Sequence, residues 1–138
     1  MKIAIMQPTF LPWIGYFSMI KNVDQFIFLD NVQFDKRSWQ QRNKIKTRNA
    51  HLILTVPVKS KGLINQKISE VEINNNENYI SKHIKSIINL YSKAKYFKNY
   101  SSDIFQLYNK NYSKLIDLNV SFIKYFCKIL DLNKNIEF

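Results

Sequence analysis

The sequence contains few of the residues that build disulfides, tight glycine loops and metal clusters. Its 138 residues include one cysteine, two glycines and two histidines. This scarcity excludes an intrachain disulfide, a P-loop and a glycine-rich dinucleotide fingerprint. It also leaves no set of side chains at the spacing of a zinc site. We therefore predict no metal, no cofactor and a reducing, cytoplasmic location.

Long apolar runs and leader-like segments are missing as well. No stretch reaches the roughly 18 uninterrupted apolar residues of a membrane-spanning helix, and no signal-peptide pattern opens the chain. Hydrophobic residues nevertheless make up 46% of the sequence and charged residues 22%, a balance typical of a packed globular domain. We expect one domain, without a membrane span, over residues 1–138.

The charge is one-sided, but its distribution is more informative than its total. A formal net charge of +11 ordinarily favours a nucleic-acid partner. The lysines are scattered, whereas the three arginines, Arg37, Arg42 and Arg48, all fall within residues 36–48, a segment without an acidic residue. Because the guanidinium fork fits phosphate and carboxylate groups, we predict that this segment binds an anion. The alternative is a solvated basic loop.

Short apolar runs separated by loops characterise the first half of the chain. Residues 3–6 and 25–30 are predicted to form strands buried on both faces, with a helix over residues 14–22 between them. Residues 50–58 predict a third strand, and residues 69–73 predict a half-exposed one. The strand–loop–helix–strand opening favours a right-handed βαβ unit.

Helical periodicity dominates the second half. Apolar residues at helical spacing predict helices over residues 79–94, 103–110 and 114–131. The apolar arc of the last helix is roughly 220° wide, about twice what a surface helix needs, so this helix requires cover on two sides. Three sources of cover are open: the sheet and other helices, a second copy or partner chain, and sequence that this polypeptide lacks.

These patterns together predict an α/β fold. We expect a three-layer arrangement whose mostly parallel sheet opens with the βαβ unit and is followed by a C-terminal group of helices. Within a single domain, residues 1–75 form the strand-rich part that carries the candidate site. Residues 76–138 form the helical part.

The loops after the first two strands carry the candidate site. Ligands of open α/β sheets bind at the carboxyl ends of the strands, which places residues 7–16 beside residues 30–43. A few polar groups among aromatic rings are typical of a small-molecule pocket, although the rings could equally be ordinary core. The candidate substrate-binding residues are Gln7, Phe10, Trp13, Tyr16, Gln33, Lys36, Arg37, Trp39, Arg42 and Asn43.

Two residues are candidates for acid–base chemistry. Asp30 ends a buried strand, a position that suits a general base or an anchor for an amine or hydroxyl group. Its alternatives are a loop cap and a partner of Arg37 or Arg42. His83 lies on the edge of an apolar helix face and is the second candidate, with core packing as its alternative.

Four blocks of the sequence carry a family resemblance. They are residues 6–17 (MQPTFLPWIGYF), 24–45 (DQFIFLDNVQFDKRSWQQRNKI), 54–58 (LTVPV) and 91–97 (YSKAKYF). In these blocks the chain resembles the WbqC-like protein family. The resemblance extends over essentially the whole chain, although Asn31 stands where the family more often has Asp. Family members also usually continue beyond a position like Phe138.

This resemblance implies a role in making bacterial O-antigen and other surface polysaccharides. It implies a transferase that acts on an amino sugar or a nucleotide-activated sugar, for instance by acyl or aminoacyl transfer to a sugar amine. Two other functions stay open. The basic and aromatic segment 34–48 suits a nucleic-acid-binding module. The wide apolar helix suits a non-catalytic partner or scaffold in a biosynthetic complex.

Overall fold

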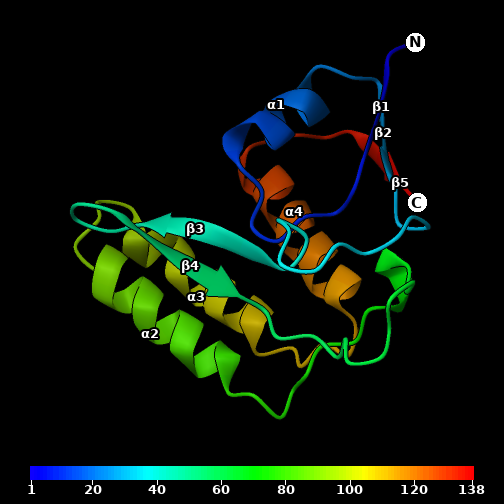
Figure 1. Ribbon diagram of the computed structural model, residues 1–138. Coiled ribbons are helices and arrows are strands. Elements are labelled where there is room, and N and C mark those ends of the chain that lie inside the picture. Colours follow the sequence, from blue (N-terminus) through cyan, green and yellow to red (C-terminus); the bar gives the residue numbers. More distant parts are fainter.

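The computed structural model describes residues 1–138 and contains four α-helices, five strands and one short 3-10 helix (Figure 1). In chain order the elements are β1 (Ile3–Met6), α1 (Ile14–Lys21), β2 (Gln25–Phe28), β3 (Arg42–Lys46), β4 (His51–Thr55), η1 (Ile68–Glu70), α2 (Tyr79–Tyr91), α3 (Phe97–Tyr108), α4 (Leu115–Ile129) and β5 (Asn135–Glu137). The predicted α/β class is confirmed. None of the helices has the length and apolar character needed to cross a membrane.

Three strands form a parallel sheet in the order β1–β2–β5. Because side chains alternate along a strand, Phe26 and Phe28 lie on one face of the sheet, where both are buried and Phe26 packs against Tyr16 of α1 with ring centroids 5.3 Å apart. On the opposite face Ile3 and Ile5 are 46% and 57% exposed. The expectation that both faces of these strands are buried is therefore wrong for β1. The βαβ opening itself is present as β1–α1–β2.

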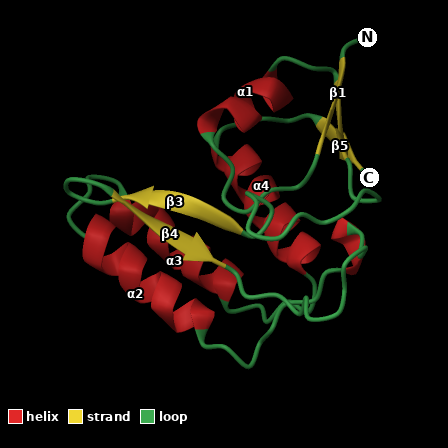
Figure 2. Cartoon of the chain, in the orientation of Figure 1, coloured by secondary structure: helices red, strands yellow, loops and turns green.

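The third strand, β4, belongs to a separate antiparallel hairpin with β3. Figure 2 shows this hairpin lying across α2 and α3. The hairpin places residues 42–46 of the basic segment in a regular strand, which the sequence did not predict. The strand predicted over residues 69–73 does not form as a regular strand. Its start is the 3-10 helix η1, closed by a hydrogen bond from the Lys67 backbone N–H to the Glu70 carboxylate (2.8 Å), and its end pairs only through isolated antiparallel bridges of Glu72 with Lys114 and of Ile73 with Val58.

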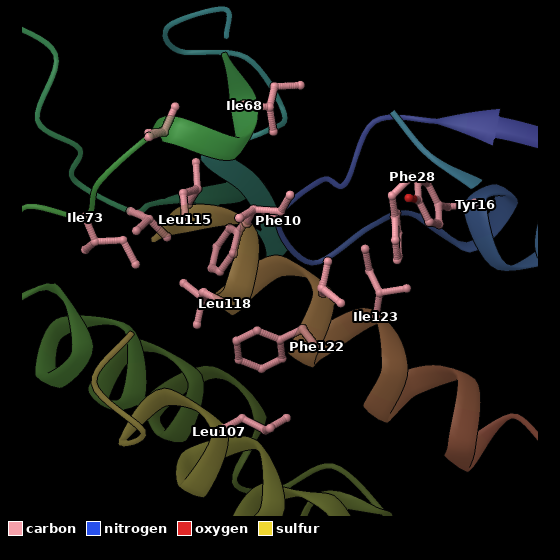
Figure 3. Packing of buried hydrophobic residues seen from close by; sticks show 14 of the residues in the cluster. Phe10, Tyr16, Phe28, Ile68, Ile73, Leu107, Leu115, Leu118, Phe122 and Ile123 are labelled. Carbon is pink, nitrogen blue, oxygen red and sulfur yellow. The ribbon is translucent and has the colours of Figure 1, made fainter. Parts of the chain in front are cut away.

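Helix α4 lies at the centre of the molecule. Its buried side chains include Leu118, Phe122 and Ile123, which face Phe10 from the first loop and Leu107 from α3 (Figure 3). The sheet and α1 lie on one side of α4, and the hairpin with α2 and α3 lies on the other (Figure 1). The chain's own elements therefore supply two-sided cover over most of this helix.

Helix α3 begins earlier than the periodicity indicated, at Phe97 rather than near Asp103. The rings of Phe97 and Phe105 lie on the same side of this helix, with centroids 6.3 Å apart. This contact ties the first turn to the rest of the helix, although exposed polar residues weaken the apolar pattern there.

Candidate functional site

Two loops meet at the carboxyl edge of the parallel sheet. One follows β1 and the other follows β2, and parallel strands end at the same edge. The backbone N–H of Phe10 donates to the carbonyl oxygen of Trp39 (3.0 Å). The side-chain amide of Gln40 donates through Nε2 to Oε1 of Gln7 (2.9 Å). Residues 29 and 33 positions apart in sequence are thus tied together beside the strand ends.

Two further amides, the buried Asn119 and the half-buried Asn43, strengthen this junction. Asn119, fully buried on α4, donates through Nδ2 to the carbonyl oxygens of Gln40 (2.8 Å) and Pro8 (3.2 Å). Asn43 on β3 donates through Nδ2 to the carbonyl oxygens of Phe10 and Leu11 (3.1 and 2.7 Å). Since buried carbonyl groups need partners, these amides fix the positions of both loops. Asn43, predicted to bind substrate, therefore has its amide N–H groups engaged within the protein.

Sequence reasoning missed Gln40 and Asn119. The available signal was Asn119 itself, a polar residue that stands within the apolar arc of the last helix, four positions after Leu115. A buried amide in such a place requires hydrogen-bond partners from other elements.

Replacing Asn119 by alanine is expected to lower the free energy of unfolding by about 2 kcal/mol, because two buried carbonyl oxygens lose their partner. Urea unfolding followed by circular dichroism measures this change. Asn89→Ala on α2, an exposed helical position, is the matched control and should have no such cost. Equal stability of the two variants would contradict the structural role of Asn119.

The four aromatic residues predicted to bind substrate differ in their exposure. Phe10 and Tyr16 are completely buried, and the Tyr16 hydroxyl donates to the carbonyl oxygen of Gln7 (3.1 Å) while burial raises its pKa. Trp13 and Trp39 are 64% and 50% exposed. The Trp13 ring lies over Gly15, where any Cβ would collide with it. Only the two tryptophans of this set are free to stack on a ligand.

Positive charge gathers on one face of the hairpin. Arg42, Lys44 and Lys46 alternate along β3 and so project from the same face. The ammonium group of Lys44 lies 5.8 Å from the centroid of the exposed Trp39 ring, a cation–π arrangement. The molecule's one ion pair joins Lys59 to Glu72, so no cation on this face has a carboxylate partner.

Arg37 lies in the second loop with a backbone φ of 62°, in the left-handed region that non-glycine residues seldom occupy. Its N–H donates to Oε1 of the buried Gln41 (3.0 Å), whose Nε2 donates in turn to the carbonyl oxygen of Val56 (3.2 Å). The core therefore holds an unfavourable backbone conformation, while the guanidinium of Arg37 stays exposed. Lys36, the preceding residue, is also exposed.

Asp30 opens the loop after β2 and is half-buried. Its carbonyl oxygen accepts a hydrogen bond from the N–H of Ser69 (3.0 Å), whereas its carboxylate has no hydrogen bond and no ion pair. The neighbouring Gln33 is turned toward residues 64–67, donating through Nε2 to the carbonyl oxygen of Ile64 (3.0 Å). Asp30 thus leaves a carboxylate free at the strand edge, and Gln33 does not.

His83 occupies a different environment, between α2 and β4. Its Nε2 donates to the carbonyl oxygen of Thr55 (3.1 Å), which fixes Nδ1 as the acceptor from the Tyr108 hydroxyl (3.2 Å). The ring is 5% exposed and packs beside Phe10. Burial lowers the pKa of His83 to about 4, so the imidazole is neutral near pH 7. Both ring nitrogens are engaged within the protein.

The structure offers little for a metal or a thiol nucleophile. No three His, Cys, Asp or Glu side chains lie together in a group that could hold a metal ion. Cys127 is buried on α4, and burial raises the pKa of its thiol to about 11. A thiolate is therefore not available at neutral pH. The free groups at the loop junction are a carboxylate, guanidinium and ammonium groups, and two indole rings.

Comparison with known proteins identifies a protein family. The sequence model of the WbqC-like protein family matches residues 7–138. The chain is also 35% identical over 133 residues to "Uncharacterized protein Rv1507c" of Mycobacterium tuberculosis. That match covers 96% of this chain but 57% of the relative, so the chain spans little more than half of that protein's length. No solved structure matches the chain.

Proposed function

Since the chain belongs to the WbqC-like protein family, we propose that it takes part in bacterial surface-polysaccharide biosynthesis by binding an amino sugar or a nucleotide-activated sugar at the loop junction. One observation carries the proposal: the polar groups at the junction fall into two sets. The amides of Gln40 and Asn119 hydrogen-bond within the protein and hold the two loops together, whereas the Asp30 carboxylate and the Arg37 and Arg42 guanidinium groups have no protein partner.

Each free group suits one part of such a ligand. Arg37 and Arg42 match the phosphates of an activated sugar, because guanidinium groups bind phosphate oxygens in pairs. The exposed ring of Trp39 offers a stacking surface for a base or a sugar ring. Asp30 suits a sugar amine or hydroxyl group, to which a carboxylate is a strong acceptor. Trp13 supplies a second exposed ring at the first loop.

The reaction that these groups suit best is acyl or aminoacyl transfer to a sugar amine. The amine nitrogen attacks the carbonyl carbon of an activated ester or thioester. The new C–N bond forms as the bond to the alcohol or thiol leaving group breaks. Asp30 takes the proton that the amine loses and passes it to the leaving group. The single, buried Cys127 is in keeping with the reducing cytoplasm that we propose as the place of action.

Arg42→Ala is expected to weaken the binding of a nucleotide sugar about tenfold, equivalent to about 1.4 kcal/mol. Titration calorimetry with UDP-linked amino sugars, and with UDP alone, measures this effect. Arg48→Ala is the matched control, because Arg48 is an exposed arginine of the same segment beyond the far end of β3.

Asp30→Asn should retain nucleotide binding and lose transfer.

Two results would count against this proposal. In the first, Arg48→Ala and Arg42→Ala weaken binding equally, which would indicate diffuse attraction rather than a site. In the second, no nucleotide sugar binds while arbitrary single-stranded oligonucleotides bind with a steep salt dependence. That pattern would identify the basic face of the hairpin as a nucleic-acid surface.

A further inference from the structure

A cavity of about 590 Å³ lies between α2, α3 and the C-terminal end of α4, and Leu11 and Pro12 of the first loop border it on the remaining side. Its volume is within the range of about 300–1,000 Å³ that is typical of small-molecule sites. Nineteen residues line it, and fifteen of them are hydrophobic. Of the groups that are free for a ligand at the loop junction, only Lys44 also lines this cavity.

The cavity is an open apolar groove whose floor reaches the core. It reaches Tyr108, which is completely buried, and Phe17, which is 6% exposed, while its rim carries the largely exposed Ile14 and Tyr96. A groove that descends from exposed side chains to buried rings suits a narrow hydrocarbon chain.

The charged residues of the wall all have the same sign. Lys44 and Lys95 line the cavity, and no acidic residue does. Neither lysine forms an ion pair, and each ammonium group lies over an aromatic ring, Lys44 over Trp39 (5.8 Å) and Lys95 over Tyr96 (5.1 Å). An anionic headgroup is the complement of such an entrance.

We propose that this cavity binds an anionic single-chain amphiphile, with the hydrocarbon chain in the groove and a phosphate or carboxylate headgroup at Lys44 and Lys95. The binding energy comes mainly from the chain, since each buried methylene group strengthens binding about fourfold. The lysines select the sign of the headgroup. This site adjoins the loop junction through Lys44 and the first loop, but the proposal does not depend on the proposed sugar chemistry.

The test uses the full chain and three matched probes below their micelle concentrations: hexadecyl phosphate, hexadecyltrimethylammonium and inorganic phosphate. Calorimetry should show one molecule of hexadecyl phosphate bound per chain, weaker binding of the cationic probe and none of inorganic phosphate. Palmitate should bind as hexadecyl phosphate does, because the headgroup contributes charge rather than phosphate geometry. Alkyl phosphates of decreasing length should bind progressively more weakly.

Two kinds of variant test where the headgroup and the hydrocarbon chain bind. Lys95→Glu should weaken hexadecyl phosphate binding about tenfold by replacing an attractive headgroup contact with a repulsive one. Lys93→Glu, the same change at an exposed lysine outside the wall, should change it little. Ser101→Phe fills the groove and should abolish chain binding. If it fails to fold, Ile129→Asp at the rim takes its place.

Three outcomes would overturn the proposal. They are equal affinity for anionic and cationic chains, undiminished binding in the filled variant, and no amphiphile binding together with a concentration-dependent dimer that Ser101→Phe abolishes. The last would identify a second copy as the occupant. Sedimentation velocity of the wild type and Ser101→Phe distinguishes that case. Nucleotide-sugar binding, measured on the same samples, reports separately on the loop junction.

Discussion

Phe122→Ala should lower the free energy of unfolding by about 3–5 kcal/mol, which is the usual cost of deleting a buried phenyl ring. Phe122 is completely buried on α4 and packs against Phe10 from the first loop, Tyr108 from α3 and Phe126 from the next turn (Figure 3). The cavity left by its ring would lie among rigid neighbours from several elements, which limits collapse. Denaturant unfolding at pH 7 measures the loss.

Phe138→Ala is the matched control, since that ring is 64% exposed although it lies beside Phe28. It should cost well under the amount lost at Phe122, because exposed positions contribute little. Because Phe10 belongs to the loop that Gln40 and Asn43 hold, Phe122→Ala should also weaken ligand binding at the loop junction. Similar stability of both variants would mean that α4 is not the centre of the core.

The stability of the protein is expected to fall by about 3 kcal/mol as the pH is lowered from 7 to about 4, through His83 alone. The pKa of His83 is lowered from 6.5 to about 4 in the folded state because burial disfavours the charged ring. In the unfolded chain the imidazole takes up its proton below about pH 6.5. The contribution is therefore fully present above pH 6.5 and is lost as the pH falls toward 4.

His83→Leu tests this expectation. The variant should be less stable than the wild type at pH 7, since Thr55 and Tyr108 lose their hydrogen-bond partner, but its stability should fall less between pH 6.5 and pH 4. His51→Gln, at the exposed second histidine, should retain the wild-type slope. A slope that persists in His83→Leu would assign the acid sensitivity to other groups.

The sequence alone determined the elements that repeat a local pattern. The apolar runs at residues 3–6 and 25–30 and the helix between them produced the βαβ unit, because strand and helix periods are properties of neighbouring residues. The same holds for α2 and α4, whose apolar spacing is continuous. The rule that parallel strands end at one edge then brought the first two loops together.

Elements without a local pattern were decided by tertiary contacts. β3 has one apolar residue, Ile45, among five, and it is a strand because β4 pairs with it along its whole length. β5 has three residues and is defined by its pairing with β2. Residues 69–73 have the alternating strand pattern, but a 3-10 turn forms at their start and only Glu72 and Ile73 pair, each through one isolated bridge.

For the candidate site, too, the sequence predicted some features and tertiary packing decided the others. The sequence identified its loops, its clustered arginines and Asp30, because those depend on position along the chain. It did not distinguish the buried rings of Phe10 and Tyr16 from the exposed rings of Trp13 and Trp39. Burial depends on which surfaces α4 and α1 cover. Likewise, Asn119 meets Gln40 across 79 positions of sequence, and only the packed chain places an amide donor where a buried carbonyl requires one.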